Sequence, residues 1–177
     1  RRDVTITHYQ VTSATNIKSQ RRLGELNTGK YRRDWRNPLL PGTVLNIGYN
    51  WSLIRFSDVL LMYAECLNET GQTSQAYQYV QRVRSRVGLP NLAITKPNMT
   101  AAQMRDQLAH ERLLEFCLEG HRFDDIRRWG WLQDATKLAE LKLRDPEFNT
   151  YQAGREFYPI PQREINTNPG VKQNAGY

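Results

Sequence analysis

The sequence lacks a long hydrophobic run, and it also lacks common motifs of nucleotide-binding proteins and hydrolases. No stretch of the 177 residues approaches the ~18 to 20 consecutive apolar residues that a membrane-spanning helix needs. It contains no glycine-rich phosphate-binding loop and no turn that presents a nucleophilic serine between a strand and a helix. The sequence therefore gives no support to a membrane-spanning helix or to either of these enzyme classes.

Cysteine and histidine are scarce, with two and three residues respectively. Cys66 and Cys117 fall inside apolar helical stretches, and their spacing is not that of a metal site. We therefore predict two buried free thiols rather than a disulfide. A carboxylate-bridged metal site in a helix bundle needs Glu-x-x-His, and neither His110 nor His121 has a glutamate three residues before it. We predict no metal and no cofactor.

Basic residues exceed acidic residues by 25 to 18, which gives a formal net charge of +7. The segment 31–36 interleaves basic and aromatic residues, as single-strand nucleic-acid binders do. A charged loop is the more common meaning of such a run, and the basic excess is not clustered elsewhere. We predict that nucleic acid is not a partner.

Residues 1–52 have the least regular pattern. Val4 and Ile6 alternate with polar residues, and a second short strand pattern covers residues 43–47. A polar, basic segment with glycine and proline lies between them. We expect a loop-rich lead-in with short strands.

Residues 53–177 are predicted to form one helical region that begins with two helices joined by a short turn at Gly71. In the first helix, apolar residues fill most of one side, and three acidic residues share a narrow polar stripe: Asp58, Glu65 and Glu69. The second helix has apolar residues at amphipathic spacing: Ala76, Val80, Val83 and Val87. Such a short turn requires antiparallel packing, and small residues at the turn resemble a tetratricopeptide unit.

Turn and capping signals divide the rest of the chain. A proline-containing linker covers residues 91–98, and Thr100 with Gln103 forms a capping box that opens the next helix. A further helix is predicted from Leu132 to Leu143, before Asp145-Pro146 stops it. The prolines in residues 157–165 favour an extended tail that ends in a helical turn.

Residues 111–130 are predicted to form a long helix, a glycine break and a second short helix. Three glutamates recur at every fourth position on the same side as apolar residues: Glu111, Glu115 and Glu119. A carboxylate out of water needs a cationic or hydrogen-bonding partner. We therefore predict a structural ion network with nearby arginines: Arg112, Arg122, Arg127 and Arg128.

Four segments, taken in order, resemble one known protein family. They are residues 53–65, 83–89 and 111–130, then Tyr158-Pro-Ile-Pro161 with the Asn168-Pro169 turn and the ending Gln173-Asn-Ala-Gly-Tyr177. Together they resemble the C-terminal part of the SusD/RagB family of nutrient-binding outer-membrane lipoproteins of Bacteroidetes.

The resemblance implies a mainly α-helical fold of tetratricopeptide-like helix pairs with long irregular loops and a few short strands. It also implies an acylated, surface-exposed protein of the outer membrane that presents glycans to a SusC-like TonB-dependent transporter. Because the chain starts at Arg1 without a start methionine, we expect a processed product or a fragment, with any lipid anchor upstream. The resemblance transfers no binding residue by position.

The function predicted from these features is non-catalytic binding of a glycan or another nutrient. Sugar recognition uses flat aromatic faces together with polar groups for the hydroxyls. Loop aromatics offer such faces, and four are candidate ligand contacts: Trp35, Tyr49, Trp51 and Tyr151. Core packing is the competing interpretation, above all for Trp51, and Trp129 and Trp131 are predicted to pack internally.

Two other functions compete with glycan binding. A glycosidase needs two carboxylates facing each other across a cleft, whereas Glu111, Glu115 and Glu119 lie on one face of one helix, so no enzyme activity is predicted. The alternative that stays open is a tetratricopeptide-like protein-interaction scaffold without its own glycan site.

Overall fold

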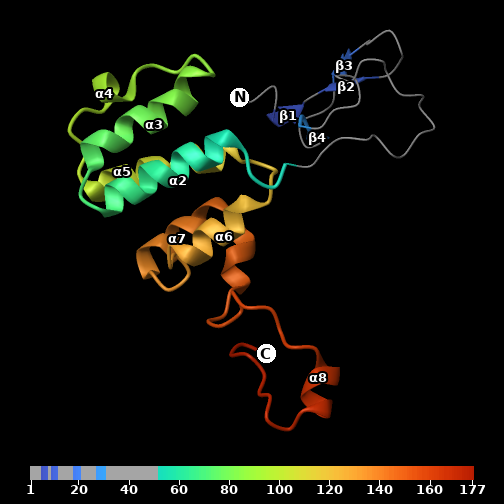
Figure 1. Ribbon diagram of the computed structural model, residues 1–177. Helices are drawn as coiled ribbons and strands as arrows, with labels where there is room; N and C mark the ends of the chain where they lie inside the picture. The colour runs from blue at the N-terminus through green and yellow to red at the C-terminus, as the bar shows by residue number, and fades with distance from the viewer. Residues whose placement is uncertain (1–4, 8, 12–17, 21–26, 31–51) are drawn as a thin grey trace. The chain divides into compact units, whose positions relative to one another are not determined.

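The structure is a computed structural model that describes residues 5–7, 9–11, 18–20, 27–30 and 52–177. Helices dominate this part of the chain, as Figure 1 shows, which confirms the predicted mainly α-helical class. The chain divides into two compact units, Arg1–His121 and Arg122–Tyr177. The predicted boundary after residue 52 is not the division between these units and stays a prediction.

Short antiparallel strand pairs form the described part of the lead-in. β1 (Ile6–Thr7) pairs with β4 (Asn27–Thr28), so that Ile6 lies opposite Thr28. β2 (Tyr9–Val11) pairs with β3 (Lys18–Gln20), with Tyr9 opposite Gln20. A strand at Ile6 was predicted and is confirmed, whereas the predicted strand at 43–47 lies outside the described residues.

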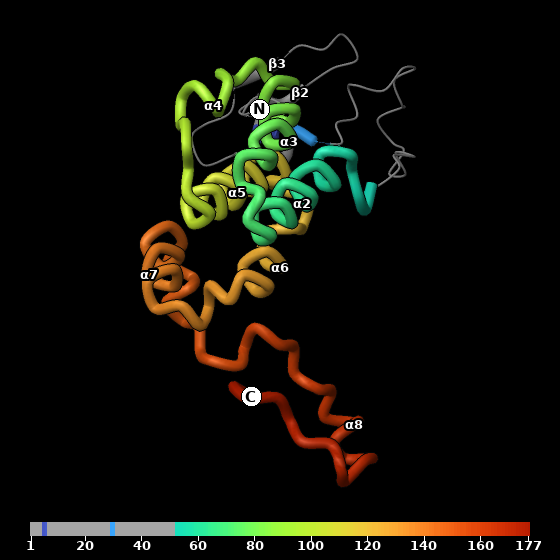
Figure 2. The backbone as a smooth tube through the Cα atoms, turned by 60° about the vertical axis from the view of Figure 1, so that its left-hand side comes forward, coloured from blue at the N-terminus to red at the C-terminus, as the bar shows by residue number. Residues whose placement is uncertain are grey.

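Two helices joined by a short turn form the centre of the first unit. α2 (Phe56–Glu69) and α3 (Thr73–Ser85) pack side by side with α5 (Ala101–Glu115), as Figures 1 and 2 show. The predicted helix pair is confirmed. Its core contains buried residues from all three helices and the segments beside them: Leu60, Leu61, Ala64, Leu67, Ala76, Val80, Val83, Leu92, Met104, Leu108 and Phe116.

Asn68 ties the three helices together at one end of this core, where it is 1% exposed. Its amide nitrogen donates to the carbonyl of Ala101 at 3.0 Å, and its side-chain oxygen accepts from the Thr73 hydroxyl at 2.8 Å. A buried amide with both ends bonded holds its neighbours in one arrangement.

The predicted faces of α2 are partly wrong. Asp58, expected on the polar stripe, is only 4% exposed, whereas Phe56 and Tyr63, expected on the apolar side, are 64% and 50% exposed. The reason is an ion pair, because Asp58 accepts from Arg112 of α5 at 2.7 Å. A long-range partner of this kind overrides the simple amphipathic pattern.

The segment between α3 and α5 is more regular than predicted. α4 (Leu92–Thr95) lies inside the expected linker, and the side chain of Asn91 caps it by accepting from the amide of Ala93. The predicted capping box is confirmed, since Thr100 and Gln103 each accept from the other's backbone amide.

α5 ends earlier than the apolar pattern predicted. It stops at Glu115, and Leu118 has a φ of +64°, which an α-helix does not allow. The break therefore starts before Gly120, and Cys117 lies outside the helix.

Both cysteines are free, as predicted. Cys66 is nevertheless exposed and Cys117 is half-buried, so the predicted burial is wrong. Cys66 is placed on the side of α2 that faces away from the core, and Cys117 follows the end of α5.

Buried glutamates of α5 and the residues after it are paired with cations, as predicted. Glu111 is fully buried and pairs with Arg84 of α3. Glu115, 4% exposed, lies 3.0 Å from Arg55 and 2.6 Å from Arg86.

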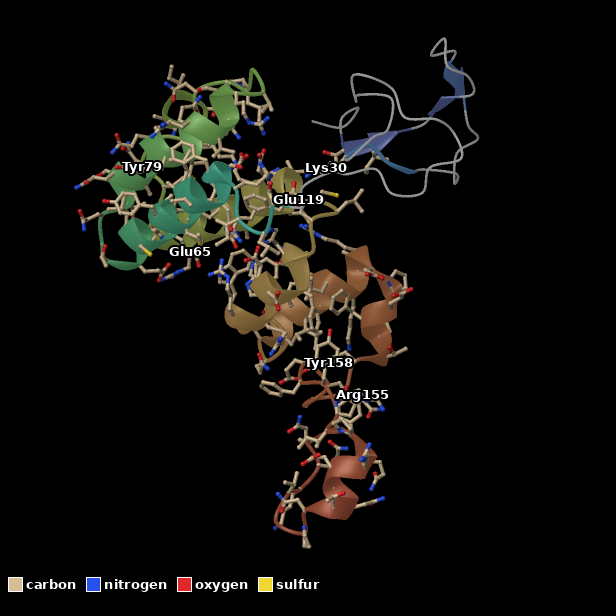
Figure 3. All side chains as sticks on the ribbon, turned by 45° about the vertical axis from the view of Figure 1, so that its right-hand side comes forward. Lys30, Glu65, Tyr79, Glu119, Arg155 and Tyr158 are labelled. Atoms are coloured by element: carbon tan, nitrogen blue, oxygen red, sulfur yellow. The ribbon has the colours of Figure 1, made fainter. Side chains whose placement is uncertain are left out.

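Glu119 completes this network. It pairs with Lys30, as Figure 3 shows, and with Arg55 at 2.7 Å. Arg55 therefore joins Glu115 and Glu119, and it also lies 4.9 Å from the ring of Phe116.

The described ion pairs of the glutamates involve other cations than the predicted ones. The ion pairs described for Glu111, Glu115 and Glu119 come from Lys30, Arg55, Arg84 and Arg86. Arg112 pairs with Asp58. Arg127 and Arg128 pair within their own helix with Asp124 and Asp125, at 3.6 and 2.9 Å, and Arg122 lies 4.9 Å from the ring of Trp131. The reason is tertiary packing, because Lys30, Arg55, Arg84 and Arg86 come from other segments that pack against α5 and the residues after it.

Short helices and a small core build the second unit. After α6 (His121–Arg128) come α7 (Ala135–Arg144), the 3₁₀-helix η2 (Pro146–Thr150) and α8 (Gln162–Thr167). Ile126, Leu132 and Leu141 form the core, with Trp131 packed against it as predicted. The predicted helix after Leu132 is confirmed, but it starts at Ala135 because Asp134 caps it.

In the part of the chain that the structure describes, the helices are all too short or too polar to cross a membrane.

Removing Arg112 tests the buried ion pair. We expect Arg112→Met to lower the free energy of unfolding by ~3 to 5 kcal/mol, because it leaves the buried Asp58 carboxylate without its counter-ion. Arg105→Met is the matched control, since the Arg105 and Glu69 side chains are 57% and 44% exposed and such a pair contributes at most about 1 kcal/mol. Urea unfolding measures both variants, and equal losses would contradict the interpretation.

Glu119 makes the stability of the fold depend on pH in the acidic range. Burial alone raises its pKa, but hydrogen bonds from Arg55 and Lys30 outweigh burial and hold the pKa below its ordinary value of 4.5. The stabilisation is therefore present above that value and is lost as the pH falls through the lowered pKa. We expect Glu119→Gln to be less stable at neutral pH and to lose less stability on acidification. Thermal unfolding from pH 7 to pH 3 measures this, with the exposed Glu164→Gln as control; parallel curves for Glu119→Gln and the unchanged chain would contradict it.

Candidate functional site

Of the four predicted ligand contacts, Tyr151 is the one that the described residues contain. Trp35, Tyr49 and Trp51 lie outside those residues. Tyr151 is half-buried, follows η2 directly, and packs against the small core of the second unit. Both predicted interpretations of this aromatic residue, core packing and ligand contact, are therefore compatible with its position.

Tyr151 lines an open hollow of about 300 Å³. The lining combines carboxylates, a guanidinium, a hydroxyl and aromatic rings: Asp145, Glu147, Phe148, Thr150, Tyr151 and Arg155. The volume is at the lower end of the range for small-molecule sites. Several polar groups beside aromatic rings are what a sugar-binding surface requires.

Asp145 and Pro146 shape the first part of the hollow. The Asp145 carboxylate accepts from the backbone amide of Glu147 at 3.0 Å and so caps η2. Pro146 occupies the first position of η2, where a backbone N–H would have no partner within the helix. The Thr150 hydroxyl donates to the Glu147 carbonyl at 2.8 Å and closes the same turn. The lining residues 145–150 are thus fixed by local hydrogen bonds.

Glu156 supports Tyr151 and the loop that leads to Arg155, and it is only 8% exposed. One of its oxygens accepts from the Tyr151 hydroxyl and from the Gly154 amide, both at 2.8 Å. The other oxygen accepts from the Gln133 side chain at 2.8 Å. Glu156 therefore fixes the orientation of Tyr151 relative to the loop that follows it.

The pKa values follow from this arrangement. Burial, followed by the hydrogen bond and negative charge of Glu156, raises the pKa of Tyr151 to about 12. The pKa of Glu156 is lowered, first by a hydrogen bond to its own backbone and then by the Tyr151 hydroxyl. The Tyr151 hydroxyl is therefore neutral at physiological pH, and it donates a hydrogen bond to Glu156.

Arg155 supplies the cationic group of the lining. Its Nε donates to the carbonyl of Gly176 at 3.1 Å, and its guanidinium carbon lies 5.8 Å from the centre of the Tyr177 ring. Among the described residues, no hydrogen bond engages its two terminal nitrogens. Arg155, whose side chain is labelled in Figure 3, is exposed, so these nitrogens are accessible from solvent.

The end of the chain folds back and positions Arg155. Gln173 exchanges two hydrogen bonds with the backbone of Ile160, at 2.8 and 3.0 Å, and Asn174 donates to the carbonyl of Tyr158 at 2.7 Å. These side-chain amides take the place of a paired strand. The approach is close, because a Cβ on Gly154 would lie 2.3 Å from the Ala175 carbonyl oxygen.

Sequence reasoning missed most of this lining. Asp145, Glu147 and Arg155 were not predicted as ligand contacts. Asp145-Pro146 was interpreted only as a helix stop, although an aspartate that caps a 3₁₀ turn is also presented beside the following aromatic residues. Arg155 carried no signal of its own, since its position depends on residues 173–177.

The arrangement of acidic groups in the lining differs from that of a glycoside-hydrolysing site. No group of three or more metal-ligating side chains occurs in the described ranges. Asp145 and Glu147 come from one turn of chain, whereas glycoside hydrolysis needs carboxylates on either side of the scissile bond.

Comparison with known protein families gives a match over almost the whole chain. A sequence model described as the SusD family matches residues 3–177. SusD-like protein P25 of Formosa agariphila is 30% identical over 160 residues, which cover 86% of this chain and 30% of the relative. The starch-binding protein SusD of Bacteroides thetaiotaomicron is 28% identical over 125 residues, or 71% of this chain and 21% of that protein.

Solved structures show the same relationship. A SusD superfamily protein from Bacteroides vulgatus aligns with a TM-score of 0.60 and 32% identity, covering 70% of this chain and 27% of that structure. A SusD-like protein from Bacteroides fragilis aligns with a TM-score of 0.57 and 28% identity, covering 72% and 26%. The chain spans about 30% or less of the length of these relatives.

Gly154→Ala tests whether the chain end positions the hollow. We expect it to detach residues 173–177, because the added Cβ would overlap Ala175 and the φ of +98° is strained for alanine; left-handed strain alone costs about 1 to 3 kcal/mol. Digestion with carboxypeptidase measures the detachment. Gly170→Ala is the control, since its nearest neighbour would be 3.4 Å away. Equal digestion of both variants would contradict the close packing.

Proposed function

The chain belongs to the SusD family, and on this basis we propose that it serves non-catalytic glycan binding in nutrient uptake. The observation that carries the proposal is the family match over residues 3–177. A relative in the same family is named as a starch-binding protein. The structure adds a hollow whose groups suit hydroxyl-rich ligands.

Within this chain, we propose the hollow as a glycan contact site. The rings of Phe148 and Tyr151 offer apolar surface for a sugar face. The terminal nitrogens of Arg155 can donate hydrogen bonds to hydroxyl oxygens. Asp145 and Glu147 accept from hydroxyl donors.

We further propose that the whole protein acts at the cell surface of the outer membrane, held there by a lipid anchor, and delivers its glycan to a SusC-like TonB-dependent transporter. Family membership supports this partnership and location. In this role the protein concentrates a glycan next to the transporter and has no need to cleave it.

A second candidate function is a tetratricopeptide-like protein-interaction scaffold without its own glycan site. The observation that favours it is the exposed apolar side of α2, where Phe56, Val59 and Tyr63 are 64%, 45% and 50% exposed. Large exposed apolar side chains on one helix face are a feature of interaction sites. These residues belong to the first unit, so both functions can use the same chain.

Affinity electrophoresis of the full chain in gels that contain a panel of plant, starch-like and host-derived glycans tests the proposal. We expect at least one glycan to retard the chain and Arg155→Ala to weaken that binding about tenfold, because it removes charged hydrogen bonds worth about 1.5 kcal/mol. Tyr151→Ala should weaken it further, and Tyr151→Phe should keep the ring contact.

Arg163→Ala is the matched control, because Arg163 is an exposed arginine of α8 outside the hollow. If a glycan retards the chain and Arg155→Ala behaves like Arg163→Ala, the site lies elsewhere. If no glycan retards a folded chain, the scaffold function is favoured.

A further inference from the structure

The lining of the hollow is negatively charged, although the chain is strongly basic. The lining contains two carboxylates, Asp145 and Glu147, and one guanidinium, Arg155, so its formal net charge is −1. The whole chain carries +7. The lining therefore differs in sign from the net charge of the chain as a whole.

The hydrogen-bonding groups of the lining are also mostly acceptors. The Tyr151 hydroxyl donates its hydrogen bond to Glu156, and the Thr150 hydroxyl donates its hydrogen bond to the Glu147 carbonyl, each at 2.8 Å. Both oxygens can then only accept from a ligand. The carboxylates of Asp145 and Glu147 accept only, so Arg155 is the one lining side chain with donors left to offer.

A negatively charged lining with mostly acceptor groups favours ligands that carry hydrogen-bond donors. Sugar hydroxyls donate and accept, so they can satisfy both the acceptors and Arg155. A uronate or sulfate group brings acceptors alone and is repelled by two carboxylates while it is attracted by one guanidinium. The Glu147 carboxylate has no ion pair or hydrogen bond among the residues that the structure describes, so its charge is not neutralised there.

We propose that the hollow takes an uncharged glycan and excludes anionic ones, with Glu147 as the specificity-determining residue. This inference rests on the proposed function. Glu147 suits this role because it is exposed, next to Phe148, and fixed at its backbone by Asp145. Asp145 adds a second negative charge from the same turn.

The test compares each glycan with its own charged form. Soluble starch, galactomannan and laminarin are used before and after oxidation of their primary hydroxyls to carboxylates, which changes charge and keeps the sugar backbone. Binding to the full chain is measured by calorimetry at 150 mM salt, where long-range attraction to the basic chain is screened. We expect the unmodified form of the retained glycan to bind at least about fivefold more tightly than its oxidised form, as expected for like charges ~5 Å apart in a wet site.

Charge variants locate the origin of this preference. Glu147→Lys should abolish or reverse the preference, and Glu147→Gln should reduce it. Glu164→Lys makes the same change of charge on α8, outside the hollow, and should leave the preference intact. Both side chains are exposed, and equal thermal unfolding midpoints confirm that the variants are folded.

The outcomes separate this inference from the proposed function. Tighter binding of the oxidised glycan, lost in Arg155→Ala, overturns the inference and leaves glycan binding standing. Equal effects of Glu147→Lys and Glu164→Lys also overturn it, because the preference then comes from total charge. Failure of a folded chain to bind any glycan, charged or uncharged, overturns both.

Discussion

The first unit depends on carboxylates that are buried between its helices and paired with cations from other segments. Asp58, Glu111 and Glu115 are each at most 4% exposed, and a buried carboxylate without a partner is strongly destabilising. Each pairing joins two segments: Asp58 links α2 to α5, Glu111 links α5 to α3, and Glu115 links α5 to Arg55 at the start of α2. Apolar packing brings α2, α3 and α5 together, but these pairs specify how they align. Any rotation of one helix would leave several charges unpaired at once.

The second unit uses the same principle on a smaller scale and leaves several polar groups of the hollow exposed. Glu156 is buried and holds Tyr151, Gly154 and Gln133. Around this fixed point, residues 145–150 are held by an aspartate cap and Arg155 by the returning chain end. The buried carboxylate is structural, whereas the exposed groups of the hollow keep free hydrogen-bonding capacity. A small core is sufficient because hydrogen bonds, more than apolar packing, position the lining.

Sequence patterns predicted the features that depend on neighbours in the chain. The capping box of Thr100 and Gln103, the α2–α3 pair and the burial of the glutamates follow from spacing alone. The partners of those glutamates did not follow, because Lys30, Arg55, Arg84 and Arg86 are brought to them by tertiary packing. The burial of Asp58 was missed for the same reason. In the hollow, Tyr151 was predicted as a loop aromatic, whereas Arg155 depends on contacts with Gly176 that no local pattern encodes.

Hydrogen–deuterium exchange of the full chain, with and without a glycan that retards it, tests most directly whether the hollow is a binding site. Binding there predicts slower exchange in peptides that cover residues 145–156, together with residues 173–177 that hold Arg155 in place. Peptides from α2 and α3 should exchange at unchanged rates. Protection confined to those helices, with none at residues 145–156, would contradict the account and place the glycan on the helical surface of the first unit.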